Sequence, residues 1–172
     1  NSNNQLIKAE IYFEKGRLKE SEKLYRDLIS RGQGDYKCYG NLAKICAFRN
    51  KWEEAKLLLE KALSLNKNYI DAYNLLGIFY KNNNKIEEAI ETYTHALSID
   101  PNHPEVLNNL SNTLRLDGDL DSAIEFSRKA ILQRPDYSDA LHNLGICFLE
   151  KEEFKRAIDY FNKALSNKQD NA

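Results

Sequence analysis

The sequence predicts an all-α solenoid of five helix-turn-helix repeats, and three observations carry this prediction. The chain repeats itself without insertion or deletion in blocks that begin at Ser2, Tyr36, Ile70, Pro104 and Ser138. Small residues recur at fixed positions of the block, and each block holds two apolar stripes at helical spacing. A constant period of 34 residues is typical of stacked repeat units, which build an extended surface instead of a single cleft.

Small residues mark the expected helix contacts. The twentieth position of the block reads Ser21, Ala55, Ala89, Ala123 and Ala157, and the twenty-seventh reads Leu28, Ala62, Ala96, Ala130 and Ala164. A larger side chain would overpack a site where two helices approach closely. Both positions are therefore predicted to be buried between helices.

The block from Ile70 to His103 shows the elements in order. Its first helix is predicted from Tyr73, Leu76, Gly77 and Tyr80, which are spaced i, i+3, i+4 and i+7. Residues 81–85 are polar and form a turn, and the same apolar spacing then runs from 86 to 97. Pro101 follows as a stop signal.

The turn between the two helices requires a particular backbone conformation. The fifteenth position of the block reads Gly16, Asn50, Asn84, Gly118 and Glu152. Glycine and asparagine tolerate the left-handed conformation that ends a helix sharply. For Glu152 the sequence predicts a turn that is either strained or differently shaped.

These residues resemble the tetratricopeptide repeat (TPR) family over essentially the whole chain. The third block matches the family pattern in Tyr73, Leu76, Gly77, Tyr80, Ala89, Tyr93, Ala96 and Pro101, and the first block is the most degenerate. The resemblance implies a right-handed superhelical solenoid and a single array over 1–172. Its repeats would be 2–35, 36–69, 70–103, 104–137 and 138–171.

The resemblance also implies a concave groove lined by the first helix of each block. The candidate peptide-binding residues at the inward positions are Lys37, Asn41, Lys44, Asn74, Lys81, Asn108, Asn109, Asn112, Arg115, His142 and Asn143. Asparagine holds the sixth position in three blocks, and its amide both donates and accepts. This series resembles the asparagine ladder in the TPR region of O-linked N-acetylglucosamine transferases, although Leu75 interrupts it. The alternative is a merely polar helix position in an asparagine-rich chain.

A carboxylate clamp of the kind that grips chaperone C-termini is matched only in part. Asn112 and Asn143 stand at clamp positions, but Asn108 stands where the pattern requires lysine. We therefore do not expect binding of chaperone tails.

Composition and missing motifs exclude several classes of function. The formal net charge is −1, which disfavours nucleic-acid and membrane-surface partners, and no window is apolar enough to span a membrane. His95, His103 and His142 have no metal-ligand spacing, and no phosphate loop or nucleophile motif occurs. We expect no catalysis, no metal and no cofactor. Cys38, Cys46 and Cys147 are predicted to be buried thiols, which fits a reducing, cytoplasmic compartment.

The expected function is that of a protein–protein interaction module that binds a peptide or partner protein in the groove. Two alternatives stay open: the substrate-recruiting arm of a larger glycosyltransferase or sulfotransferase, and a self-assembling scaffold. The last helix presents Ile158, Phe161 and Leu165 where TPR arrays usually add a covering helix. Either the chain was cut from a longer protein, or self-association covers this end.

Overall fold

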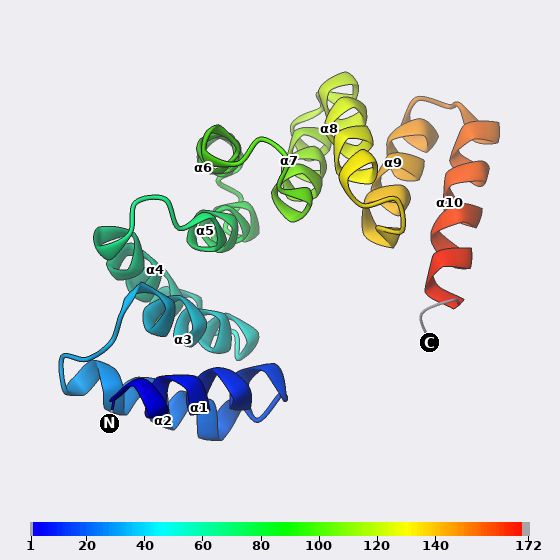
Figure 1. Cartoon of the computed structure of the whole chain (residues 1–172). Helices are drawn as coiled ribbons and strands as arrows, with labels where there is room; N and C mark the ends of the chain where they lie inside the picture. The colour runs from blue at the N-terminus through cyan, green and yellow to red at the C-terminus, as the bar shows by residue number, and fades with distance from the viewer. Residues whose placement is uncertain (1, 170–172) are drawn as a thin grey trace. The chain divides into compact units, whose positions relative to one another are not determined.

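The computed structural model describes residues 2–169, and the regular structure in that range is helical throughout (Figure 1). The helices in chain order are α1 (Ser2–Glu14), α2 (Leu18–Ser30), α3 (Tyr36–Phe48), α4 (Trp52–Leu65), α5 (Ile70–Asn82), α6 (Ile86–Ile99), α7 (Pro104–Asp117), α8 (Leu120–Gln133), α9 (Ser138–Glu150) and α10 (Phe154–Gln169). Every odd-numbered helix begins at the first residue of a sequence block. The predicted all-α fold is confirmed.

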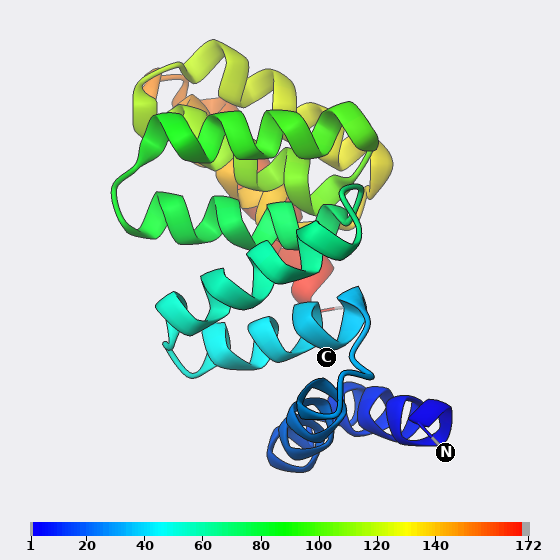
Figure 2. The same cartoon turned by 90° about the vertical axis from the view of Figure 1, so that its left-hand side faces the viewer.

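The chain comprises two compact units, residues 1–79 and 80–172, with the boundary inside α5. In the first unit α1 packs on α2, α2 on α3, and α3 on α4. In the second unit each helix from α6 to α10 packs on the next, and α7 also contacts α9 directly. The turned view shows the helices and their short connecting loops from another side (Figure 2). Within the described residues, every helix is too short or too polar to cross a lipid bilayer.

All five turns between paired helices share one backbone conformation. The fifteenth position of the block has φ of 69° at Gly16, 59° at Asn50, 58° at Asn84, 91° at Gly118 and 61° at Glu152. The same two hydrogen bonds close each turn; in the last one Glu152 N–H donates to Leu149 O and Glu153 N–H donates to Phe148 O. The last turn is therefore shaped like the others, and it places a glutamate in a region that favours glycine.

The small residues are buried as predicted. The alanines at the twentieth and twenty-seventh positions are at most 5% exposed, and so is Ser21 in the degenerate first block. Cys38, Cys46 and Cys147 are likewise buried and unpaired. The 34-residue spacing of the blocks thus identifies the core positions of the described chain.

The eighth and twenty-fourth positions of a block face one another across each hairpin. In the last repeat a Cβ atom added at Gly145 would lie 2.6 Å from the ring of Phe161. In the fourth repeat both positions are serine, and the hydroxyls of Ser111 and Ser127 lie 2.6 Å apart in a fully buried contact. The Ser111 hydroxyl also lies 2.7 Å from the carbonyl oxygen of Ala123. A small residue opposite a large ring is thus replaced by a hydrogen-bonded pair.

Candidate peptide-binding face

The candidate residues lie on the first helices of the repeats, α3, α5, α7 and α9. We call the surface that these helices form within each unit the first-helix face. Within each unit, contacts between neighbouring first helices define this face.

In the first unit an ion pair links two first helices. Lys44 Nζ on α3 lies 2.6 Å from Asp71 Oδ2 on α5, so the charge of Lys44 is neutralised within the chain. Asn41 and Asn74 are half-buried, and Lys37 is exposed at the start of α3. Phe48, in the last turn of α3, is 79% exposed, which is unusual for a ring of this size. Among the described residues of this unit, the face therefore combines amides, a lysine without an ion pair (Lys37) and an open aromatic ring.

In the second unit α7 and α9 are joined by polar contacts. Arg115 Nη1 lies 2.7 Å from Glu150 Oε1, and Arg115 Nη2 donates to Asn112 Oδ1 at 3.1 Å. Asn143 Nδ2 donates to Asn108 Oδ1 at 2.8 Å. Candidates that lie 35 residues apart in the sequence therefore meet in space, because α7 and α9 lie against each other.

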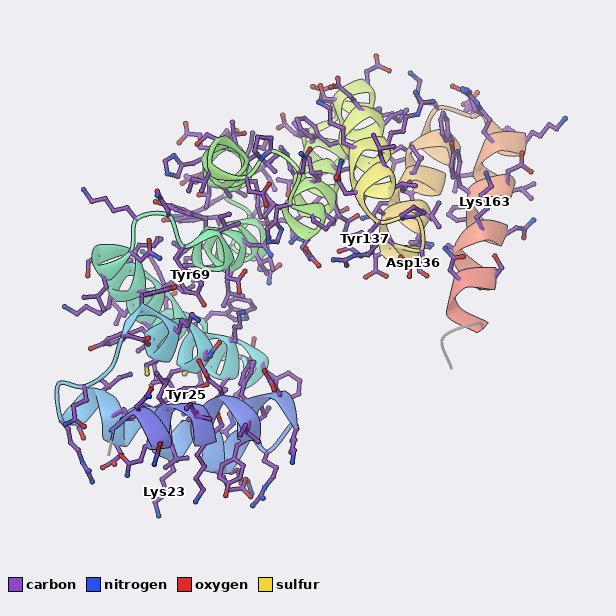
Figure 3. All side chains as sticks on the ribbon, in the orientation of Figure 1. Lys23, Tyr25, Tyr69, Asp136, Tyr137 and Lys163 are labelled. Atoms are coloured by element: carbon purple, nitrogen blue, oxygen red, sulfur yellow. The ribbon has the colours of Figure 1, made fainter. Side chains whose placement is uncertain are left out.

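Several asparagine amides serve contacts within the chain. Asn108 is only 6% exposed; it accepts from Asn143, and its Nδ2 donates to Tyr137 Oη at 3.5 Å. Asn41 Nδ2 donates to Tyr25 Oη at 3.0 Å. Figure 3 labels the two tyrosines of these contacts, Tyr25 and Tyr137. Part of the hydrogen-bonding capacity of these amides is thus used in the packing of neighbouring helices.

The identity of the sixth position follows the twenty-fourth position of the preceding repeat. The successive pairs are Tyr25 with Asn41, Leu59 with Leu75, Tyr93 with Asn109, and Ser127 with Asn143. Asparagine stands where the preceding residue carries a hydroxyl, and leucine stands where it is leucine. The interruption at Leu75 therefore matches an apolar partner. The structure gives this pattern a hydrogen bond between Asn41 and Tyr25. The Tyr93 hydroxyl is buried without a hydrogen-bond partner among the described residues, and the Ser127 hydroxyl contacts Ser111.

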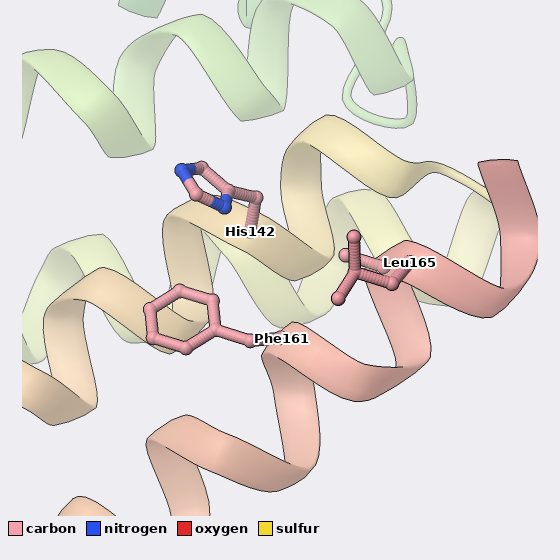
Figure 4. A pocket seen from close by; sticks show the side chains of 4 residues that line it. His142, Phe161 and Leu165 are labelled. Atoms are coloured by element: carbon pink, nitrogen blue, oxygen red, sulfur yellow. The ribbon is translucent and has the colours of Figure 1, made fainter.

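His142 lies at the edge of a hollow between α9 and α10. The hollow has a volume of about 250 Å³ and is lined by His142, Phe161, Ala164 and Leu165 (Figure 4). The imidazole and the Phe161 ring are tilted with their centroids 5.3 Å apart. The spacing that placed His142 on the groove did not indicate this aromatic contact.

Lys81 is the candidate with the most perturbed electrostatics. Burial lowers the pKa of its ammonium, and the charge of Arg115 lowers it further. The buried thiols are perturbed in the opposite sense: burial raises the pKa of Cys38 to about 12 and that of Cys147 to about 11. Thiols held in the protonated form are poor nucleophiles and poor metal ligands. Among the described residues, no group of three or more His, Cys, Asp or Glu is placed to hold a metal ion.

Comparison with solved structures gives the same architecture. The chain is 21% identical in sequence to MamA in one crystal structure, with 95% of each chain covered and a TM-score of 0.76. The Pseudomonas aeruginosa protein PilF is 15% identical in sequence, with 96% of this chain and 76% of that chain covered and a TM-score of 0.83. YrrB, described as a TPR protein with an unusual peptide-binding site, is 20% identical, with 99% and 88% covered and a TM-score of 0.72. Identities this low show a shared fold alone.

The sequence comparisons identify the family. A search of curated protein sequences gives no significant match. Models described as tetratricopeptide repeat match residues 49–113, 104–137 and 138–171. They support the family and give no support to the narrower resemblance to O-linked N-acetylglucosamine transferases. Since the matched ranges span most of the chain and its helices follow the repeat throughout, the chain belongs to the tetratricopeptide repeat family.

Proposed function

We propose that the chain is a protein-interaction module that binds an extended peptide, or an extended segment of a partner protein, along its first-helix face. The observation that carries the proposal is the joining of neighbouring first helices by polar side chains, at Lys44–Asp71 in one unit and Asn108–Asn143 in the other. These contacts hold donors and acceptors in place along a surface, and such preorganisation lowers the entropic cost of binding.

The remaining capacity of the face suits a peptide backbone. After its internal bond, Asn143 keeps an amide oxygen and one N–H, and Asn41 keeps the same pair. Exposed apolar side chains on the first helices, above all Phe48 on α3, offer contacts for side chains of the ligand. These observations support a ladder of amides in a restricted form, in which Asn41 and Asn143 each use one donor for packing and keep the remaining groups for the ligand.

The ladder is tested by selecting ligands for the whole chain from phage-displayed random 12-residue peptides. Fluorescence anisotropy then compares a selected peptide on the wild type, on Asn109→Ala and on Asn109→Ala with Asn143→Ala. We expect roughly tenfold weaker binding for the double variant, because two hydrogen bonds to the ligand are lost. Asn162→Ala, at an exposed site on α10, is the matched control. Unchanged affinity with an intact far-ultraviolet circular dichroism spectrum would contradict the ladder.

The alternative of a substrate-recruiting arm uses the same face and differs only in what the module serves. The self-assembling scaffold uses another surface, and one observation favours it. Ile158 and Leu165 on α10 are 58% and 61% exposed, whereas Ile124, which is equivalent to Ile158 in the preceding repeat, is 8% exposed. Burying such side chains would stabilise an assembly by roughly 1.5–3 kcal/mol each.

Self-association is measured by the light-scattering mass of the whole chain over a concentration series. We expect the mass to rise with concentration, and Ile158→Lys to return it to that of a monomer, because a charge at the contact is costly to bury. Leu57→Lys, at an exposed apolar site on α4, is the control. A constant monomer mass across the series would exclude the scaffold.

A further inference from the structure

Lys81 differs from the other half-buried cations of the described chain. The remaining half-buried lysines and arginines each have a carboxylate within 4.0 Å, in the pairs Lys44–Asp71, Lys56–Glu60, Arg115–Glu150 and Arg134–Glu105. Lys81 is half-buried in the last turn of α5, and no carboxylate among residues 2–169 pairs with it. A partly desolvated ammonium without a counter-charge is an unfavourable arrangement in a free protein.

The charged side chain that acts on the Lys81 ammonium is another cation, Arg115. Arg115 occupies the last turn of α7, at the same position of its repeat as Lys81, and both residues belong to the second unit. The guanidinium of Arg115 opposes the protonation of Lys81. Glu150 pairs with Arg115, so Lys81, Arg115 and Glu150 together carry two positive charges and one negative charge. One positive charge is left for a ligand.

Apolar groups accompany this charge on the same turns of the first helices. Leu116 directly follows Arg115 and is 52% exposed, and Leu149 directly precedes Glu150 and is 46% exposed. Exposed apolar side chains next to Arg115 and Glu150 in the chain favour a ligand that carries a carboxylate next to an apolar side chain. The low local dielectric strengthens the attraction between the charges.

We propose that Lys81 and Arg115 form an anion subsite of the first-helix face, which binds a carboxylate of a peptide that also inserts an apolar side chain beside Leu116 and Leu149. This subsite rests on the proposed peptide-binding function and adds its selectivity: the ligand is an acidic–apolar segment. The ligand carboxylate supplies the counter-charge that residues 2–169 do not give to Lys81.

The test is peptide selection with two versions of the whole chain, wild type and Lys81→Gln. Phage-displayed random 12-residue peptides are selected on each, in one library with internal inserts and in another with free C-termini. Wild type is expected to enrich Asp or Glu next to Leu, Ile or Phe, and Lys81→Gln to lose the acidic residue but retain the apolar one. Lys155→Gln, at an exposed and unpaired site on α10, is the control and should select as wild type does.

A double-mutant cycle then measures the contact itself. Replacing the acidic residue of a selected peptide by its amide should weaken binding to wild type about tenfold and leave binding to Lys81→Gln nearly unchanged. If amidation of the peptide C-terminus has this effect instead, the carboxylate comes from the chain end. In the complex, the pKa of Lys81, followed by NMR of its side chain, should rise.

The outcomes separate the two proposals. If no peptide is enriched on wild type by either library, the peptide-binding function itself is wrong. If peptides are enriched without an acidic preference, or if Lys81→Gln selects the same acidic peptides, peptide binding stands and the subsite is overturned. If Lys81→Gln selects the same acidic peptides, Lys81 acts instead as a cation near the negative end of α5. Thermal unfolding of Lys81→Gln would then show a lower stability than that of wild type.

Discussion

At the scale of single residues, the position that ends the first helix of each hairpin shows how one backbone angle constrains the sequence. Glycine or asparagine occupies it in four repeats, and the fifth repeat adopts the same angle with Glu152, at φ 61°. A residue with a Cβ atom costs roughly 1–2 kcal/mol in this conformation. The two hydrogen bonds of the turn, and the packing of α9 on α10, hold Glu152 in place despite this cost.

Replacing Glu152 by glycine should therefore stabilise the protein. We expect a gain of about 1 kcal/mol in the free energy of unfolding, because the relief of strain exceeds the added flexibility of the unfolded chain. Thermal unfolding measures the change, which corresponds to an increase of roughly 3 °C in the midpoint. Glu87→Gly is the control: Glu87 is exposed in the first turn of α6, and glycine there should lower stability. A lower midpoint of thermal unfolding for Glu152→Gly than for wild type would show that the backbone at Glu152 is not strained.

At the scale of helix pairs, stability depends on matched residues at the eighth and twenty-fourth positions. Gly145 leaves room for the Phe161 ring, while Ser111 and Ser127 fill the same space with a hydrogen bond. In the third block, which matches the family pattern best, these two positions are Gly77 and Tyr93. In the fourth repeat both are serine, and their hydroxyls contact each other, so the hairpin keeps a filled and satisfied contact.

This matching predicts strong coupling between two substitutions. Ser127→Phe alone should destabilise by roughly 1–3 kcal/mol, because the ring meets the Ser111 side chain. Adding Ser111→Gly recreates the pair found in the last repeat and should recover much of that loss, although glycine inside α7 costs about 1 kcal/mol. Chemical unfolding of the four proteins of the cycle gives the coupling energy. Simple additivity of the two changes would show that the positions do not share one space.

At the scale of the whole molecule, acidic and basic residues nearly balance, and many of them pair between repeats. Arg26–Glu54 joins the first and second repeats, and Lys151–Asp121 joins the fourth and fifth. The hydrogen bond from Arg26 lowers the pKa of Glu54 below its usual 4.5. Glu105 shows the same direction: burial raises its pKa, but the hydrogen bond and charge of Arg134 outweigh that effect.

Stability should consequently fall in acid. A carboxyl group whose pKa is lower in the folded state stabilises the fold above the pKa of its unfolded state, and this contribution is lost as pH falls through the folded pKa. We expect a nearly constant unfolding midpoint above about pH 5 and a decline below about pH 4. The part due to Glu54 is modest, since its side chain is 37% exposed. Arg26→Gln should flatten the decline, and a slope equal to that of wild type would remove this pair from the explanation.

The family, the helix starts, the left-handed turns and the buried small residues could all be predicted from the sequence, because each is a local requirement that recurs at a fixed period. Tertiary structure alone decided how the polar positions are used. The spacing marks Asn41, Lys44 and Lys81 equally as groove positions. Only the packing of neighbouring helices shows that Asn41 bonds Tyr25, that Lys44 pairs with Asp71, and that no carboxylate in the described part of the chain pairs with Lys81. The physical reason is that satisfaction of a polar group depends on partners distant in the sequence, which the repeat pattern does not encode.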